Sequence, residues 1–158
     1  MIEERWGSDK VTHRPSGWES LLPHLLPRLE TGQAPSLLES LMTPARVKPI
    51  ITLDVLNQID VRVGTILSVA DVPNSDNLMQ LRVDFGDHER TIVAGIRKER
   101  ANPREIEGRQ ALFVVNLEPR KMRGVLSEGM LFDIGYGDGI TPVLSVPESP
   151  VPNGTRAG

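Results

Sequence analysis

The sequence predicts a small all-β domain, a five-stranded barrel with one short helix, that begins near residue 50. Two observations predict this fold class. Apolar and polar residues alternate over several short runs, which is the period of a strand with one buried face. Glycine, asparagine, aspartate and proline separate these runs at short intervals, as the turns of a small β domain do. Residues 50–158 are therefore predicted to be one barrel domain.

Residues 1–49 are predicted to be an N-terminal extension, mostly irregular or weakly helical. Six prolines interrupt every candidate helix in it, because proline removes an amide donor and disfavours helical geometry in the residue before it. The run "ESLLPHLLPRLE" nevertheless repeats leucine at helical spacing. It favours a short helix or, alternatively, a segment that docks on a partner.

The barrel domain is predicted to begin with a short helix in "TLDVLNQ". The Thr52 hydroxyl can cap its free amides, and Leu53 and Leu56 share one of its faces. The first strand follows over residues 61–69. Gly64 lies inside this strand, where a glycine is expected to mark a bulge or a sharp bend.

The later elements complete the predicted barrel. Residues 79–85 alternate with a period of two, and a short connection after Gly86 joins them to "RTIVAGI" as a hairpin. "NPREIEG" is predicted to form a helical turn, and "RQALFVVN" and "GMLFDIG" a fourth and a fifth strand. Three strands, a short helix and two more strands form the order of an oligonucleotide/oligosaccharide-binding (OB) barrel. Phe85 and Phe113 fall on apolar strand phases and are predicted to be core.

Composition excludes several functional classes. The chain has 158 residues with 18 Lys plus Arg against 21 Asp plus Glu, a net charge of -3 that is ordinary for a soluble globular protein. It has no cysteine, so a disulfide framework and a thiolate metal site are not expected. His13, His24 and His88 are scattered, which predicts no metal site. No apolar run approaches the roughly 20 residues that span a bilayer.

Catalysis and secretion are not predicted either. No nucleophile and base are paired in the sequence, and no glycine loop for phosphates or other cofactor motif is present. We therefore expect a protein that is not an enzyme and that needs no cofactor. The first residues, "MIEERWGSDK", contain acids where a secretory signal has basic residues. Together with the lack of cysteine, they predict a cytoplasmic protein without a membrane segment.

The stretch "NLEPRKMRGVLSEGM" concentrates positive charge in an acidic chain. The loop between the fourth and fifth strands of an OB barrel borders its ligand face, so a basic loop there can contact phosphates. The alternative is that its cations are only solvated, or pair with Glu118 and Glu128. The cations of this loop are Arg120, Lys121 and Arg123.

A second basic cluster lies around the predicted helical turn. It consists of Arg97, Lys98, Arg100 and Arg104, and three glutamates dilute it. We treat Arg97, Lys98 and Arg100 as auxiliary candidates for RNA binding.

Residues 59–134 resemble the tRNA-binding domain family. The resemblance rests on four ordered motifs: "DVRVG" from Asp60, "SDNL" from Ser75, "VDFG" from Val83, and "NLEPRKMRGVLSEGM" from Asn116. "PVPNGTRAG" near the C-terminus is similar to the family's tail. The family includes free-standing tRNA-binding proteins, domains appended to some methionyl- and phenylalanyl-tRNA synthetases, and the CsaA export chaperone.

The sequence departs from the family pattern at three places. Val72 and Pro73 stand for the usual His-Pro, and Ala94 and Gly95 for the usual Ser-Gly. Glu118 replaces the usual lysine after Asn-Leu. This last departure opposes tRNA affinity, because it places a negative charge on the segment that should face phosphate.

The resemblance implies a non-catalytic domain that binds folded tRNA by shape and phosphate contacts. It places Ser127, Met130 and Asn116 at or near the binding surface, beside the three cations. Each has an alternative role in the fold: the "SEGM" residues can shape the entry to the fifth strand and fill the barrel mouth, and Asn116 can satisfy backbone amides in the turn before Pro119. With two of the phenylalanines predicted to be core, a stacking platform for single-stranded RNA is not expected.

The resemblance also implies partners. Free-standing members are homodimers, and here "ITLDVLNQI" and residues 140–158 would supply the contact. An aminoacyl-tRNA synthetase is a further expected partner. The alternative function is that of a CsaA-like export chaperone, which would bind unfolded client polypeptides in the same cleft.

Overall fold

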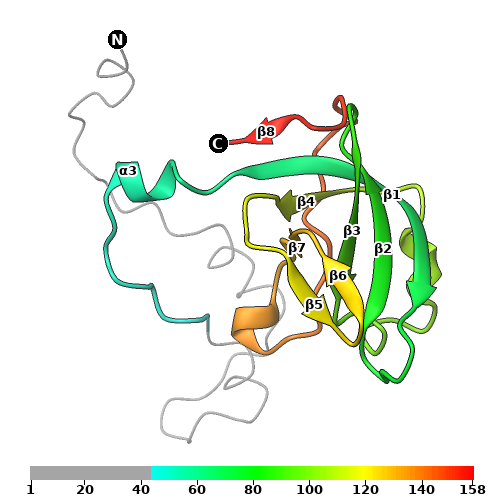
Figure 1. Ribbon diagram of the computed structural model, residues 1–158. Coiled ribbons are helices and arrows are strands. Elements are labelled where there is room, and N and C mark those ends of the chain that lie inside the picture. Colours follow the sequence, from blue (N-terminus) through cyan, green and yellow to red (C-terminus); the bar gives the residue numbers. More distant parts are fainter. Residues whose placement is uncertain (1–43) are drawn as a thin grey trace, which may run out of the picture. The chain divides into compact units, whose positions relative to one another are not determined.

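The structure is a computed structural model that describes residues 44–158, and one curled antiparallel sheet dominates it (Figure 1). The strand order is β3-β2-β1-β4-β7, β8 pairs with β1, and β5 and β6 form a separate two-stranded sheet. The prediction of an OB-type barrel is confirmed. The predicted helix or docking segment in "ESLLPHLLPRLE" lies outside the described residues. The strands are β1 (Val61–Asp71), β2 (Met79–Asp84), β3 (Glu89–Ala94), β4 (Gln110–Val114), β5 (Arg120–Met122), β6 (Val125–Ser127), β7 (Met130–Leu131) and β8 (Arg156–Ala157).

Within residues 44–158 three short helices accompany the strands, α3 (Leu53–Leu56), η2 (Pro103–Ile106) and η3 (Tyr136–Asp138). α3 is capped as predicted, since the Thr52 hydroxyl accepts a hydrogen bond from the Val55 amide over 3.3 Å. η2 is the predicted helical turn between the third and fourth strands, with Asn102 as its N-cap. No helix within residues 44–158 has the length and apolar character needed to cross a membrane.

β1 is long because different parts of it pair with different strands. Its first half, Val61–Thr65, pairs with β4, and its second half pairs with β2. We expected Gly64 to mark a bulge or a sharp bend; the register shift of β1 lies between Ile66 and Ser68, so Gly64 is not the site of the bulge. Gly64 instead leaves room for packing, because a Cβ atom there would lie 2.5 Å from Cγ1 of Val83.

The core lies inside the curl of the sheet. Phe85 and Phe113 are both buried, as predicted, and their rings meet edge to face with centroids 5.6 Å apart. β2 turns alternate residues inward, which confirms its period of two. The largest fully buried side chains are Phe85, Phe113, Ile66, Leu81, Ile92, Ile96, Ile106, Val72 and Val83.

Side chains help to close the barrel between β3 and β7. β7 has only two residues, so the fifth strand is shorter than predicted. The Ser127 hydroxyl accepts from the Val93 amide over 3.0 Å, and the Glu128 carboxylate accepts from the Thr91 amide over 3.0 Å. The Glu128 amide also donates to the Thr91 carbonyl over 2.8 Å. Ser127 and Glu128 therefore satisfy the backbone groups of Thr91 and Val93 at the open edge of β3.

The C-terminal segment forms an additional strand that the sequence pattern did not predict. β8 pairs with the start of β1, opposite Val61 and Arg62. Just before it, the Gly154 amide donates to the Val63 carbonyl over 2.7 Å, and the Val63 amide donates to the Thr155 carbonyl over 2.9 Å. Part of residues 140–158, the segment predicted to contribute to a homodimer contact, thus packs against its own domain.

Candidate functional site

The basic stretch that we expected as a loop between the fourth and fifth barrel strands forms a β-hairpin. β5 and β6, drawn in yellow in Figure 1, pair in the register Arg120 with Ser127, Lys121 with Leu126, and Met122 with Val125. Arg123 and Gly124 form the two-residue connection. Both have positive φ values, 49° and 84°, as a type I′ hairpin turn requires.

The three cations of this hairpin point in different directions. Arg120 and Lys121 are neighbours in one strand, so their side chains leave on opposite faces. Lys121 shares its face with Leu126, and Arg123 occupies the tip. All three cations are exposed, and none has an ion-pair partner among residues 44–158. The charge of the hairpin is therefore not neutralised within the described part of the chain.

Arg123 occupies a backbone conformation that favours glycine or asparagine. For most L-residues the left-handed region costs roughly 1–2 kcal/mol, and the φ of 49° at Arg123 lies in that region. Where a residue is strained and no contact within the fold explains why that residue type is there, the strain points to a functional reason for the residue type. The exposed Arg123 side chain has no hydrogen-bond partner within residues 44–158, so its charge is the property to explain.

Ser127 belongs to the interior of the fold. Only 4 % of its surface is exposed, although it is polar. Its hydroxyl accepts from the Val93 amide and donates to the Gly129 carbonyl, both over 3.0 Å. Gly129 is equally constrained, because a Cβ atom there would lie 2.9 Å from the Val114 carbonyl oxygen. Of the two roles open from the sequence, this geometry favours the role in the fold for Ser127.

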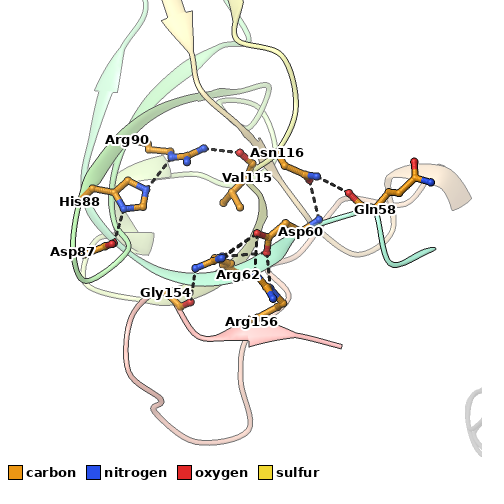
Figure 2. Close-up of polar contacts among 10 residues, drawn as sticks. All are labelled: Gln58, Asp60, Arg62, Asp87, His88, Arg90, Val115, Asn116, Gly154 and Arg156. Carbon is orange, nitrogen blue, oxygen red and sulfur yellow. Dashed lines mark hydrogen bonds and ion pairs between the residues drawn. The ribbon is translucent and has the colours of Figure 1, made fainter. Parts of the chain in front are cut away.

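Asn116 is exposed, but both of its side-chain polar atoms bind the backbone. Its Oδ1 accepts from the Asp60 amide over 2.8 Å, and its Nδ2 donates to the Gln58 carbonyl over 2.5 Å (Figure 2). The sequence allowed a role in satisfying backbone amides near Pro119. The groups that Asn116 satisfies lie instead in the segment after α3, and it fixes that segment beside the base of the hairpin.

Met130 differs from Ser127, because its side chain remains available to a ligand. It is 46 % exposed at the start of β7. Leu117 and Leu126, which lie before and within the hairpin, are about equally exposed. The cationic hairpin thus carries and adjoins exposed apolar side chains, a combination that can accept bases, sugars or apolar peptide side chains.

Two of the three auxiliary candidates, Arg97 and Arg100, make ion pairs within the domain. Arg97 forms an ion pair with Asp71 and donates to the Ser75 carbonyl over 3.1 Å. Arg100 is mostly buried between Glu99, at 3.6 Å, and Glu105, at 3.5 Å. Of the three auxiliary candidates only Lys98 is exposed without a partner among the described residues.

Two carboxyl groups near Arg100 have raised pKa values. Burial raises the pKa of Glu99, and burial also raises the pKa of Asp133. The positive charge of Arg100 lowers the pKa of both carboxyl groups and so opposes the effect of burial. The negative charge of Asp133 raises the pKa of Glu99 further. Among the described residues no group of three or more His, Cys, Asp or Glu side chains could hold a metal ion.

A polar network that the sequence did not reveal lies at one end of the barrel (Figure 2). The Asp60 carboxylate accepts from Arg62 and from Arg156 of β8, each over 3.1 Å at the shortest. Its hydrogen bond with Arg62, followed by that with Arg156, lowers the pKa of Asp60 although burial opposes the shift. Nearby, the contact with His88 lowers the pKa of Asp87. Arg156 is distant from Asp60 in the sequence, so this part of the network could not be read from local patterns.

Exposed apolar side chains also occur in two segments, around α3 and after β7. In and around α3 the residues Ile50, Ile51, Leu53, Val55, Leu56 and Ile59 are all exposed, and α3 buries none of its residues. After β7, exposed apolar residues continue through Phe132, Ile134, Tyr136, Ile140, Val143 and Val146. A four-residue helix with no buried side chain gains little from its own packing, so these residues suit an association surface.

Sequence comparison relates the barrel to known proteins. The family described as "Putative tRNA binding domain" matches residues 61–156. The methionine–tRNA ligase of Parabacteroides distasonis is 42% identical over 114 residues, which are 70% of this chain and 16% of that protein. The methionine–tRNA ligase of Thermococcus kodakarensis is 41% identical over 106 residues, 67% of this chain and 14% of that protein. The chain thus spans about a sixth of the length of these curated relatives.

Comparison with solved structures agrees. A MetRS-related protein from Pyrococcus horikoshii superposes with a TM-score of 0.65 and 36% identity, covering 70% of this chain and all of that one. The chaperone CsaA from Bacillus anthracis superposes with a TM-score of 0.59 and 29% identity over 70% of this chain and all of that one. The barrel is therefore similar both to synthetase-related proteins and to a chaperone.

Proposed function

The chain belongs to the tRNA-binding domain family, and from this premise we propose that it binds folded tRNA through the hairpin β5–β6. The family match covers residues 61–156 and so includes the whole hairpin. The observation that carries the proposal is the set of three exposed cations, Arg120, Lys121 and Arg123, without an ion-pair partner among the described residues. Such cations bind phosphates and displace condensed counterions.

The ligand is folded RNA, recognised by shape and by phosphate and 2′-hydroxyl contacts. Single-strand readers stack successive bases on exposed aromatic side chains. Phe85 and Phe113 are buried in the core, and the exposed aromatic residues Phe132 and Tyr136 follow β7, outside the hairpin. Of the remaining candidates, Met130 can pack against a sugar or a base, and Asn116 stands at the base of the hairpin. The domain has no catalytic role in this proposal and acts by binding, as an aid to tRNA structure or aminoacylation.

The proposal is tested by measuring affinity across a salt series. Fluorescence anisotropy would compare a folded tRNA, several other tRNAs and an unstructured RNA of the same length. We expect similar affinity for the different tRNAs, weaker affinity for the unstructured RNA, and a steep loss of affinity with salt. Equal binding of the unstructured RNA, or no dependence on salt, would contradict recognition of folded RNA by phosphate contacts.

A second candidate function is the binding of unfolded polypeptides. It is supported by the exposed Leu117, Leu126 and Met130 at the hairpin and by the similarity to the chaperone CsaA. Competition between tRNA and a denatured client protein distinguishes the two functions. Client binding that tRNA fails to displace would favour the chaperone function, and displacement by tRNA at low salt would favour a shared surface with tRNA as the stronger ligand.

We also propose that the protein is a cytoplasmic homodimer. The apolar side chains around α3 and after β7 supply surface for a second copy, and a two-fold contact uses the same surface twice. The similarity to methionine–tRNA ligases supports an aminoacyl-tRNA synthetase as a further partner. A tRNA ligand in turn supports the cytoplasmic location, because tRNA is used in translation there.

A further inference from the structure

Arg90 on β3 makes an unusual set of contacts. Its Nη1 donates to the Val115 carbonyl over 2.5 Å and to the Glu128 carbonyl over 3.1 Å. Its Nε donates to Nε2 of His88 over 3.0 Å, and its guanidinium carbon lies 6.0 Å from the centre of the Phe85 ring. Figure 2 shows the contacts with Val115 and His88. One half-buried guanidinium therefore joins three different segments of the chain.

Two of these segments are the two ends of the cationic hairpin. Val115 directly follows β4 and precedes the connection to β5, and Glu128 directly follows β6. Nη1 of Arg90 thus holds the points where the chain leaves the barrel for the hairpin and where it returns. Within residues 44–158 no other side chain donates to both of these carbonyls.

His88 supports Arg90 in this position. A guanidinium can only donate, so Nε2 of His88 must accept and its Nδ1 carries the proton, which it donates to Asp87 over 2.6 Å. The groups that face His88 are Asp87, Arg90 and the Phe85 ring, on which the imidazole stacks. Arg62 in turn attracts Asp87. If Nε2 of His88 were protonated, it could no longer accept a hydrogen bond, and its N–H would face the Nε–H of Arg90.

We propose that Arg90 is the positioning residue of the hairpin β5–β6, and that unprotonated His88 holds Arg90 in place. Arg90 fixes both ends of the hairpin relative to β3, and through them the three cations that meet the RNA. The proposal rests on the proposed function as far as RNA is concerned. The positioning itself is a property of the free protein and can be measured without RNA.

The test compares Arg90→Lys with a matched control, Arg82→Lys, in the full chain. Lysine keeps the charge but carries all its donors on one nitrogen, so it cannot bind the two carbonyls and His88 at the same time, as Nη1 and Nε of Arg90 do. Arg82 lies on the neighbouring strand and pairs with Glu89 over 2.5 Å at an exposed site. In Arg90→Lys we expect hydrogen exchange of the hairpin amides, residues 120–127, to accelerate about tenfold or more relative to β2. In Arg82→Lys it should stay at the wild-type rate.

Binding of tRNA separates positioning from direct contact. Arg90→Lys should bind tRNA several-fold more weakly with the wild-type slope of log affinity against log salt, because the phosphates contacted stay the same in number. A slope lowered by about one would make Arg90 a phosphate contact and overturn the proposal. So would a hairpin that stays as protected as in the wild type. If the wild type binds no tRNA while the hairpin loosens as expected, only the proposed function fails.

His88→Ala provides a second variant at an exposed site, in case Arg90→Lys does not fold. We expect the same acceleration of hairpin exchange to a smaller extent. In the wild type the exchange of residues 120–127, corrected for intrinsic rates, should accelerate relative to β2 when acid protonates Nε2 of His88. In His88→Ala this dependence should vanish. A pH dependence that persists in His88→Ala would refute the part assigned to His88.

Discussion

The Ser127 hydroxyl binds the Val93 amide over 3.0 Å, although β3 and β6 are not paired in a sheet at this point. Ser127 thereby gives the edge of β3 an acceptor that a neighbouring strand would otherwise supply. The geometry separates two kinds of residue within "SEGM". Ser127, Glu128 and Gly129 close the barrel, while Met130 remains exposed.

Ser127→Ala should destabilise the protein by about 1–3 kcal/mol. The substitution leaves the buried Val93 amide without an acceptor, and an unsatisfied buried donor costs about that much. Urea unfolding followed by circular dichroism measures the change. Leu126→Ala, on the same strand but exposed, is the control and should change stability by less than about 0.5 kcal/mol. A stable Ser127→Ala that binds tRNA more weakly would instead assign the hydroxyl to the ligand.

The combined substitution of Arg120, Lys121 and Arg123 by Ala should weaken tRNA binding by a similar factor for different tRNAs. Each lost phosphate contact lowers the salt slope by about one, so the slope should fall by up to about 3. Filter binding across a salt series measures both quantities. The control replaces three cations outside the hairpin, at positions 46, 82 and 109, which changes the net charge equally. Equal losses in both variants would mean that total charge, and not the hairpin, governs binding.

Arg123→Gly should separate stability from affinity. Glycine relieves the left-handed strain at φ 49°, which costs roughly 1–2 kcal/mol for arginine, but it adds about 0.5–1 kcal/mol of chain entropy to the unfolded state. The protein should therefore be as stable as the wild type or up to about 1.5 kcal/mol more stable, while it binds tRNA more weakly. Thermal unfolding and anisotropy test the two effects. A less stable variant with unchanged affinity would show that Arg123 serves the turn.

Asp60→Asn should destabilise the protein at neutral pH and have no effect in strong acid. Arg62 and Arg156 lower the pKa of Asp60 in the folded state, so its contribution is present above the unfolded value of about 3.9 and is lost as the pH falls through the lowered folded value. Urea unfolding of both proteins between about pH 7 and pH 2 measures the difference. The difference in the free energy of unfolding between the two proteins should be constant down to about pH 5 and shrink below about pH 4.

Asp76→Asn is the control for this dependence on pH. Asp76 is exposed and has no ion pair within residues 44–158, so its replacement should change stability little at any pH. A difference for Asp60→Asn that persists at about pH 2 would show that packing of the side chain, and not its charge, is responsible.

Replacement of Leu53 and Leu56 by Ser should convert the proposed homodimer into a monomer. Both side chains are about half exposed in the single chain, so the exchange should leave the barrel folded while it removes apolar contact area. Light scattering coupled to gel filtration measures the mass. Leu67→Ser combined with Leu126→Ser changes two similarly exposed leucines elsewhere and should leave the dimer intact. A wild-type protein that runs as a monomer would refute the proposal.

Local patterns predicted the parts of the fold that depend on neighbours in the sequence. The period of two in β2, the hairpin with β3, the cap Thr52 and the helical turn in "NPREIEG" involve residues close along the chain, and each is confirmed. The burial of Phe85 and Phe113 followed from the same alternation. Such features need no knowledge of the rest of the barrel.

The sequence could not predict contacts that depend on the closed barrel. Nothing near Asn116 indicates that it binds Gln58 and Asp60, and nothing near Arg90 indicates the carbonyls of Val115 and Glu128. The hairpin β5–β6 was missed because its strands have three residues each and its turn is Arg-Gly, without the Asn-Gly or Asp-Gly pair typical of type I′ turns. The glycine at the second turn position was the one available signal.

The pairing of β8 with the start of β1 joins residues from opposite ends of the barrel domain. During synthesis on the ribosome, the nascent chain carries Val63 long before Gly154 and Thr155, which supply its backbone partners. Native contacts between such distant residues make folding slow. A stalled or truncated product that lacks residues 153–157 would leave this part of β1 open to pairing with other chains, which makes the C-terminal strand a protection against aggregation.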